Sequence, residues 1–392
     1  MINKSQKKHN VLLLYKEFTP SVYLCGYLQL EFLKKNNYIN FRYSSVNHVV
    51  PKDLAWCEIV FLIRSDSFLE KQITKKCKRN GKFVIYVLDD DLLNVPLYIK
   101  SGLHYSRHYV RKQIKGIMMY SSALASPSYY LLKKYERICP RTISLIEPAS
   151  FIIDEKRKWD DGKIHIGFAG SVDRGRDIDV LLTDVLIEIS QKYKDRISIE
   201  FFGVCPKVSQ SLNLQSYPYE SSYKSYQEKM LKLNWDIGLA PMPVSEFHSC
   251  KYYNKFVEYS GLGIAGIYSK TIPYIDIVEN EVNGILCGNT KQEWIDSLTK
   301  LIEDTRLRKE ISQNVLSIAK SKLSVETAAI DLLKQLPKEK IYLKSEWGYF
   351  PIKWYKFCNA IIDTFEKIQK YGIKAPYKAI FKMTRLIKGT VK

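Results

Sequence analysis

The sequence lacks closely spaced cysteines and long apolar runs, and each absence excludes a class of protein. Its eight cysteines are scattered, with no CxxC pair and no Cys/His cluster, so we expect neither a disulfide framework nor a zinc site. The longest apolar runs, such as CEIVFLI at 57–63, are far shorter than a membrane span. The apolar run that follows the basic N-terminus ends at Lys16 and Glu17, so it is too short to be the apolar region of a secretion signal. These features predict a cytoplasmic protein.

Length and charge indicate the general class of the chain. With 392 residues it is too long for one ordinary core, so we expect two domains and an appendage. A hydrophobic content of 46% is typical of a globular protein. The net charge of +20 indicates an anionic partner, and it leaves open whether this is a phosphorylated small molecule, a lipid surface or nucleic acid. Because no stretch resembles an RNA-binding or helix-turn-helix module, nucleic acid is not expected.

Strand and helix patterns alternate along the chain and restart once. Continuous apolar runs predict parallel strands covered on both faces, and apolar residues three and four apart predict helices between them. The expected strands span 10–15, 58–63, 82–89, 122–127 and 142–148, then 164–170, 197–203, 236–241, 263–269 and 284–288. We therefore predict an α/β fold with two tandem Rossmann-like domains, residues 1–155 and 156–336, and a ligand cleft between the carboxyl ends of their sheets.

The stretch SCKYYNKFVEYSGLGIAG, residues 249–266, predicts a helix whose charges oppose its dipole. Ser249 is a suitable N-cap and Gly261 a suitable C-terminal residue, so Lys251 falls in the first turn and Glu258 in the last. Lys251, Lys255 and Glu258 also share one face, at i, i+4 and i+7. A bound anion near the helix start would explain the lysines, and a hydroxyl-rich group further along would explain the glutamate. The alternative is a solvated face without a ligand.

A second cationic segment, GFAGSVDRGRDID at 167–179, begins at a strand end and enters a helix. Gly170 and Ser171 form the turn, where small residues allow backbone amides to approach a phosphate, and Arg174 and Arg176 follow. Together with the lysines of the later helix, this turn predicts two cationic arms around a diphosphate. The stretch EVNGILCG at 281–288 supplies a further turn beside the cleft, with Gly284 expected at positive φ.

The segment WDIGLAPMP…F…CKYYNKFVEYSGLGIAGIYSKTIPYIDIVENEVNGILC, residues 235–287, resembles the donor-binding region of GT-B glycosyltransferases, especially family 4 (group 1). In those enzymes a D-I-G-L-x-P strand leads into a K-x-x-x-K-x-x-E-Y helix, a small-residue turn, a strand and an N-G-x-L turn. The resemblance covers residues 160–335 well and the first domain only by its fold pattern. It implies two Rossmann-like domains and a nucleotide-sugar donor.

The resemblance also assigns roles to individual residues. Glu258 would accept hydrogen bonds from the ribose hydroxyls, Lys255 and Arg174 would hold the diphosphate, and Lys251 would lie near the donor sugar or phosphate. The sequence departs from the family at two places. Cys250 occupies the position where the family often has another glutamate, eight residues before the ribose-binding one, and GSVDRGRD replaces the usual G-R-x-x-x-x-K-G loop.

The expected activity is transfer of a sugar from the nucleotide to a saccharide or lipid-linked saccharide in cell-surface polysaccharide synthesis. Fixed cations beside the departing diphosphate can replace a metal, so we expect no metal and no cofactor. The resemblance implies retention of configuration, and Cys250 in place of the family's first glutamate leaves inversion open. The sequence leaves the sugar, nucleotide and acceptor open. Two other classes remain: a nucleotide-sugar epimerase, which shares the double-Rossmann fold and would need acids in the cleft, and a non-catalytic nucleotide-sugar-binding protein.

Three aspartates end a strand of the first domain, in YVLDDDLLNVP at 86–96. We expect Asp89, Asp90 and Asp91 to face the cleft and to contact acceptor hydroxyls, and His104 is a candidate base. Asp89 and Asp91 also form a literal DxD, the metal-binding motif of the other glycosyltransferase fold. That alternative has no place for the helix of the second domain, so we expect no metal.

The C-terminal segment, residues 337–392, mixes aromatic and basic residues. It contains 13 Lys and Arg and four Asp and Glu, so its net charge is 13 − 4 = +9. Such a composition suits the surface of an anionic membrane, where lipid-linked saccharides reside, and predicts peripheral attachment at the inner face. The alternative is that the segment packs against the first domain.

Overall fold

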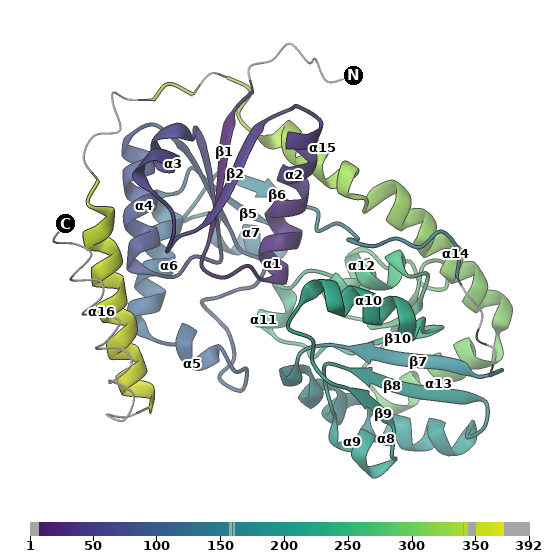
Figure 1. Ribbon diagram of the computed structural model, residues 1–392. Coiled ribbons are helices and arrows are strands. Elements are labelled where there is room, and N and C mark those ends of the chain that lie inside the picture. The colour runs from purple at the N-terminus through teal and green to yellow at the C-terminus, as the bar shows by residue number, and fades with distance from the viewer. Residues whose placement is uncertain (1–7, 157–158, 160, 340, 344–349, 372–392) are drawn as a thin grey trace.

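The computed structural model consists of two α/β domains that lie side by side, and it describes residues 8–156, 159, 161–339, 341–343 and 350–371 (Figure 1). Each domain is built on a six-stranded parallel sheet with helices on both faces. The prediction of two tandem Rossmann-like domains is confirmed.

The first sheet has the strand order β2-β1-β3-β4-β5-β6. Its strands are β1 (Asn10–Tyr15), β2 (Asn40–Ser45), β3 (Ile59–Ile63), β4 (Phe83–Val87), β5 (Ala123–Ser126) and β6 (Thr142–Ser144). In β1, Val11 and Leu13 enter one hydrophobic cluster while Leu12 and Leu14 enter another, because successive side chains point to opposite faces. Both faces are covered, so the strand is apolar throughout.

Helices of the first domain fill both sides of this sheet. They are α1 (Pro20–Val22), α2 (Leu28–Lys35), α3 (Pro51–Trp56), α4 (Phe68–Arg79), α5 (Gly102–Tyr105), α6 (His108–Tyr120) and α7 (Tyr129–Tyr135), and a π-helical turn, Tyr23–Tyr27, joins α1 to α2. Ser67 and Glu70 form a capping box that starts α4. Helices α4 and α6 contribute to one hydrophobic cluster and α2 to the other.

The second sheet repeats the architecture with the strand order β12-β11-β10-β7-β8-β9. Its strands are β7 (Ile164–Ala169), β8 (Ile197–Phe202), β9 (Gln215–Tyr217), β10 (Ile237–Ala240), β11 (Ala265–Ser269) and β12 (Ile285–Cys287). Its helices are α8 (Gly175–Lys192), α9 (Lys207–Ser211), α10 (Tyr223–Leu233), α11 (Glu246–Ser249), α12 (Asn254–Gly261), α13 (Lys291–Glu303) and α14 (Thr305–Lys322). One large core with Trp235 and Trp294 fully buried holds this domain together.

The last two helices pack against the first domain. Helix α15 (Val325–Gln335) places Ala329 and Leu332 in the same hydrophobic cluster as α2. Helix α16 (Ile352–Tyr371) packs along α4, and Phe350 and Ile352 are buried beside it (Figure 1). None of the helices in the described residues combines the length and apolar composition that a membrane span requires.

The sequence pattern missed two edge strands, β2 and β9, one in each sheet. Strand β2, NFRYSS, has only Phe41 fully buried, and β9, QSY, has no fully buried residue. An edge strand pairs on one side only and need not be an apolar run, so the criterion of continuous hydrophobicity fails there.

Candidate active site

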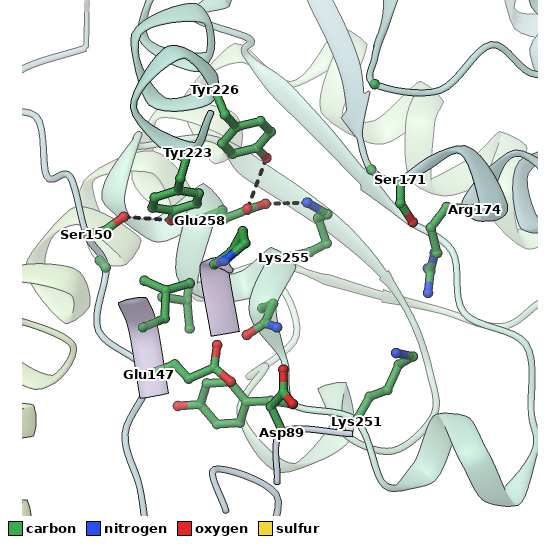
Figure 2. A pocket seen from close by; sticks show the side chains of 18 of the residues that line it. Asp89, Glu147, Ser150, Ser171, Arg174, Tyr223, Tyr226, Lys251, Lys255 and Glu258 are labelled. Atoms are coloured by element: carbon green, nitrogen blue, oxygen red, sulfur yellow. Dashed lines mark hydrogen bonds and ion pairs between the residues drawn. The ribbon is translucent and has the colours of Figure 1, made fainter. Parts of the chain in front are cut away.

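A cavity of about 380 Å³ lies between the two domains (Figure 2). Its walls come from the carboxyl ends of strands in both sheets, as expected for ligand sites in this architecture. Residues after β4, β6, β7, β8 and β10 meet α10 and α12 there. The polar lining residues central to the chemistry below are Asp89, Asp90, Glu147, Ser171, Arg174, Tyr223, Tyr226, Lys251, Lys255 and Glu258.

Glu258 and Lys255 form the polar wall on the side of the second domain. One carboxylate oxygen of Glu258 accepts a hydrogen bond from the Tyr226 hydroxyl at 3.0 Å, and the other pairs with the Lys255 ammonium (Figure 2). Both side chains are mostly buried, with 16% of Lys255 and 19% of Glu258 exposed. The stacked rings of Tyr223 and Tyr226 lie beside them, and the Tyr223 hydroxyl bonds Ser150 of the interdomain linker at 2.8 Å. Two of the residues predicted to bind the donor, Lys255 and Glu258, therefore lie together.

The predicted helix over 249–261 is wrong in its first half. A short helix, α11, follows Ser245, whose side chain caps it, and α12 begins only at Asn254. Between them Cys250 enters a core cluster of the first domain while Tyr252 enters the core of the second. Ser249 is the last residue of α11, and Tyr253 is the N-cap of α12. Ser249 is therefore not the N-cap of α12.

Because of this break, Lys251 lies outside α12 and contacts the first domain. Its ammonium lies 2.8 Å from Asp90, and the guanidinium of Arg64 lies 2.6 Å from Asp89 and 3.2 Å from Asp90. Burial by itself raises the pKa of Asp90, but the Lys251 ammonium and then the Arg64 guanidinium outweigh it and hold that pKa below its usual range. The ionised network links the two domains at the edge of the cavity.

The turn after β7 reaches the cavity as predicted. Gly170, Ser171 and Arg174 line it, and Figure 2 shows Ser171 and Arg174 on the side away from Tyr223. A side chain at position 170 would press its Cβ to within 2.7 Å of the Phe168 ring, so the turn requires glycine. Arg174 also donates to the Pro241 carbonyl at 2.8 Å and pairs with Asp177.

Two other predicted donor residues lie elsewhere. The Arg176 guanidinium stacks over the ring of Tyr98 at 4.3 Å, a contact between the domains, and it does not line the cavity. Gly284 lacks a positive φ and lies outside the cavity lining, against the Tyr268 ring, where a Cβ would come within 2.7 Å. In this turn Glu281 has the positive φ, of 64°. The prediction for Gly284 is corrected accordingly.

The three aspartates after β4, Asp89, Asp90 and Asp91, do not share one environment. Asp89 and Asp90 line the cavity, whereas Asp91 is fully buried in the first domain, where it accepts hydrogen bonds from Tyr135 at 2.5 Å and Lys134 at 2.6 Å. The prediction that Asp91 faces the cleft is wrong. Asp89 and Asp91 bind different partners, Arg64 and Tyr135, and the described residues contain no cluster of three or more His, Cys, Asp or Glu arranged for a metal.

His104 also lies outside the cavity lining, contrary to its prediction as a base there. Its Nε2 lies 2.7 Å from a carboxylate oxygen of Asp66, and Lys16 lies 3.5 Å from the other oxygen. His104, Asp66 and Lys16 therefore form a polar cluster within the first domain.

We expect Asp91→Ala to lower the free energy of unfolding by about 3 kcal/mol, because it leaves the Lys134 ammonium and the Tyr135 hydroxyl without a buried acceptor. Urea unfolding measures the change. Glu246→Ala is the matched control, since this exposed carboxylate pairs with the same lysine and should cost less than about 1 kcal/mol. Equal stability of the two variants would contradict the structural role of Asp91. If Mn²⁺ stabilised the wild type but not Asp91→Ala, that result would support the DxD hypothesis.

The sequence reasoning missed Glu147, which lines the cavity from the segment after β6. The residue is only 3% exposed, and its Oε1 accepts a hydrogen bond from the Cys25 thiol at 3.3 Å. Burial, followed by the negative charge of Asp89, raises the pKa of Glu147 to about 8. Its position at the carboxyl end of the predicted strand 142–148, where ligand sites form, is the signal that could have identified it.

No protein-family model matches the sequence, and no curated protein matches it either. Solved structures do match. Anabaena Alr3699/HepE, crystallised with UDP and glucose, superimposes with a TM-score of 0.56 at 13% identity, covering 83% of this chain and 98% of that one. A putative UDP-N-acetylglucosamine 2-epimerase from Listeria monocytogenes gives a TM-score of 0.53 at 11% identity, covering 83% and 94%.

The third neighbour is TarM, with a TM-score of 0.52 at 12% identity, covering 78% of this chain and 57% of TarM. A further structure, of TarM from S. aureus, contains Fondaparinux, alpha-GlcNAc-glycerol and UDP. At such low identities the common property is the fold. The chain thus has the double-Rossmann fold of the GT-B type, as its sequence predicted.

Proposed function

We propose that the protein is a glycosyltransferase that moves a sugar from a nucleotide-sugar donor to a saccharide or lipid-linked saccharide acceptor. The observation that carries the proposal is the pairing of Lys255 with Glu258 in the wall of the interdomain cavity, with the Ser171 turn also in its lining. Glu258 would accept hydrogen bonds from the ribose hydroxyls. Lys255, Arg174 and the turn amides would hold the diphosphate.

The reaction develops positive charge at the anomeric carbon and negative charge on the departing diphosphate. Lys255 and Arg174 stabilise that second charge more in the transition state than in the ground state, which is what accelerates the step. Lys251 would contact the sugar or a phosphate of the donor, and its ion pair with Asp90 would break when the donor binds. With retention of configuration, a phosphate oxygen of the donor can accept the acceptor's proton.

The acceptor would enter from the first domain. Asp89 and Asp90 present carboxylates to the cavity and suit acceptor hydroxyls. Residues 337–392 would hold the enzyme at an anionic membrane, where a lipid-linked acceptor resides. In support, Trp354 and Phe365 of α16 are 59% and 64% exposed although the helix packs on α4.

A second candidate function is nucleotide-sugar epimerisation. It requires carboxyl groups near the sugar for elimination, and the cavity has Asp89 and the buried Glu147. One fold neighbour is a putative enzyme of that class. The transferase remains the preferred function because it also explains the basic C-terminal segment.

The deciding experiment is turnover of UDP-glucose and of a panel of other nucleotide sugars, in EDTA, with and without saccharide and lipid-linked acceptors. We expect nucleotide release that depends on the acceptor and persists in EDTA, because Lys255 and Arg174 would supply the charge that a metal otherwise provides. Conversion of the donor without an acceptor, seen by NMR, would instead establish the epimerase. Binding without turnover would indicate a non-catalytic nucleotide-sugar-binding protein. Loss of activity in EDTA that Mn²⁺ restores would contradict the metal-independent mechanism.

A further inference from the structure

In the part of the chain that the structure describes, Glu147 is a buried carboxyl group without a paired cation. Within the described part of the chain it has no ion pair, and its hydrogen bond comes from the weak thiol donor Cys25. Yet it lines the cavity, at the end where Figure 2 shows Asp89. A structural glutamate at 3% exposure would ordinarily be paired, because an ionised carboxylate without a partner is costly to bury.

The groups around Glu147 are mostly anions or neutral hydroxyls and thiols. Asp89 and Asp90 approach from the loop after β4, and Glu258 acts from α12. The nearby cations are already paired, Arg64 with the two aspartates and Lys255 with Glu258. The other titratable groups that face it are Cys25, Tyr223, Tyr252 and Tyr253. The surroundings therefore favour a neutral carboxylic acid.

A neutral carboxylic acid has one O–H donor and keeps acceptor capacity, so it can bond to a sugar hydroxyl in both directions. It also adds no negative charge near a diphosphate. We propose that Glu147 is a specificity-determining residue whose protonated carboxyl group donates a hydrogen bond to an oxygen of the transferred sugar. This inference rests on the proposed function, because it needs a nucleotide sugar in the cavity.

Titration with UDP and with UDP-glucose tests the role. Wild type should bind UDP-glucose more tightly than UDP, and Glu147→Ala should reduce that preference about tenfold while leaving UDP affinity unchanged. Glu147→Gln keeps a neutral donor and should retain the preference. Both variants are first checked for wild-type UDP binding, which reports a folded cavity.

The pH dependence separates this role from a purely structural one. In wild type the preference for UDP-glucose should fall as pH rises through about 8, because Glu147 then ionises and loses its donor, and in Glu147→Gln it should not.

Equal loss of UDP and UDP-glucose binding in Glu147→Ala would overturn the inference, as would a pH dependence that persists in Glu147→Gln. Normal UDP-glucose binding with lost turnover in Glu147→Gln would overturn it too, since it would mean that Glu147 transfers a proton. If wild type binds neither UDP nor UDP-glucose nor any nucleotide sugar of the panel, the proposed function itself fails.

Discussion

Lys255→Ala and Glu258→Ala should each weaken binding of UDP-glucose by about 10- to 100-fold while the protein stays folded. A hydrogen bond to a charged group contributes about 1.5–3 kcal/mol, and each substitution also leaves the partner charge unpaired in a mostly buried wall. Helix stability does not require these charges: Lys255 lies in the first turn of α12, where the helix dipole disfavours a cation. Isothermal titration measures affinity, and thermal unfolding reports the fold.

The matched control is the pair Lys133–Glu136, which has the same i,i+3 spacing but is exposed. Alanine at either position should change neither UDP-glucose affinity nor stability beyond about 0.5 kcal/mol. Because Lys255 and Glu258 share one interaction, their double variant should lose less than the sum of the single losses. A variant at 255 or 258 that melts early yet keeps its affinity would show that the pair is structural.

Removal of residues 372–392 should release the protein from anionic vesicles while leaving UDP-glucose binding unchanged. This segment lies outside the described residues, and its sequence contains six Lys and Arg and no Asp or Glu, so its net charge is 6 − 0 = +6. Each basic residue near an anionic leaflet contributes about 1 kcal/mol, so half of them would account for roughly a 100-fold change in partitioning. Vesicle flotation measures it.

The structure also decides where the truncation must start. Cutting after Leu336 would remove Phe350 and Ile352, which are buried in the first domain, and would confuse loss of binding with loss of fold. A second variant, Trp354→Ala with Phe365→Ala, removes the exposed aromatics of α16 and should weaken the attachment that survives high salt. Flotation of the truncated chain as complete as that of the full chain would contradict the membrane hypothesis. Trp347, a further aromatic residue of the C-terminal segment for which we predict membrane contact, lies outside the described residues.

The sequence by itself determined the two-domain α/β architecture. Buried parallel strands must be apolar on both faces, so β1, β3 and β4 were recognisable as continuous runs. The spacing of charged and apolar residues likewise predicted that Lys255 and Glu258 lie on one helix after β10. These features depend on residues close together in the chain, and their periodicity reports them directly.

Only the tertiary structure decided which charged groups meet. Lys251 and Asp90 are 161 positions apart, and their contact depends on the segment between α11 and α12 crossing to the first domain. Asp91 differs from its neighbours only because its side chain points into the core toward Tyr135. The raised pKa of Glu147 likewise follows from burial and from carboxylates on other elements. Burial and long-range electrostatics are properties of the assembled fold, so the sequence pattern could locate these residues at strand ends without assigning their charge or their partners.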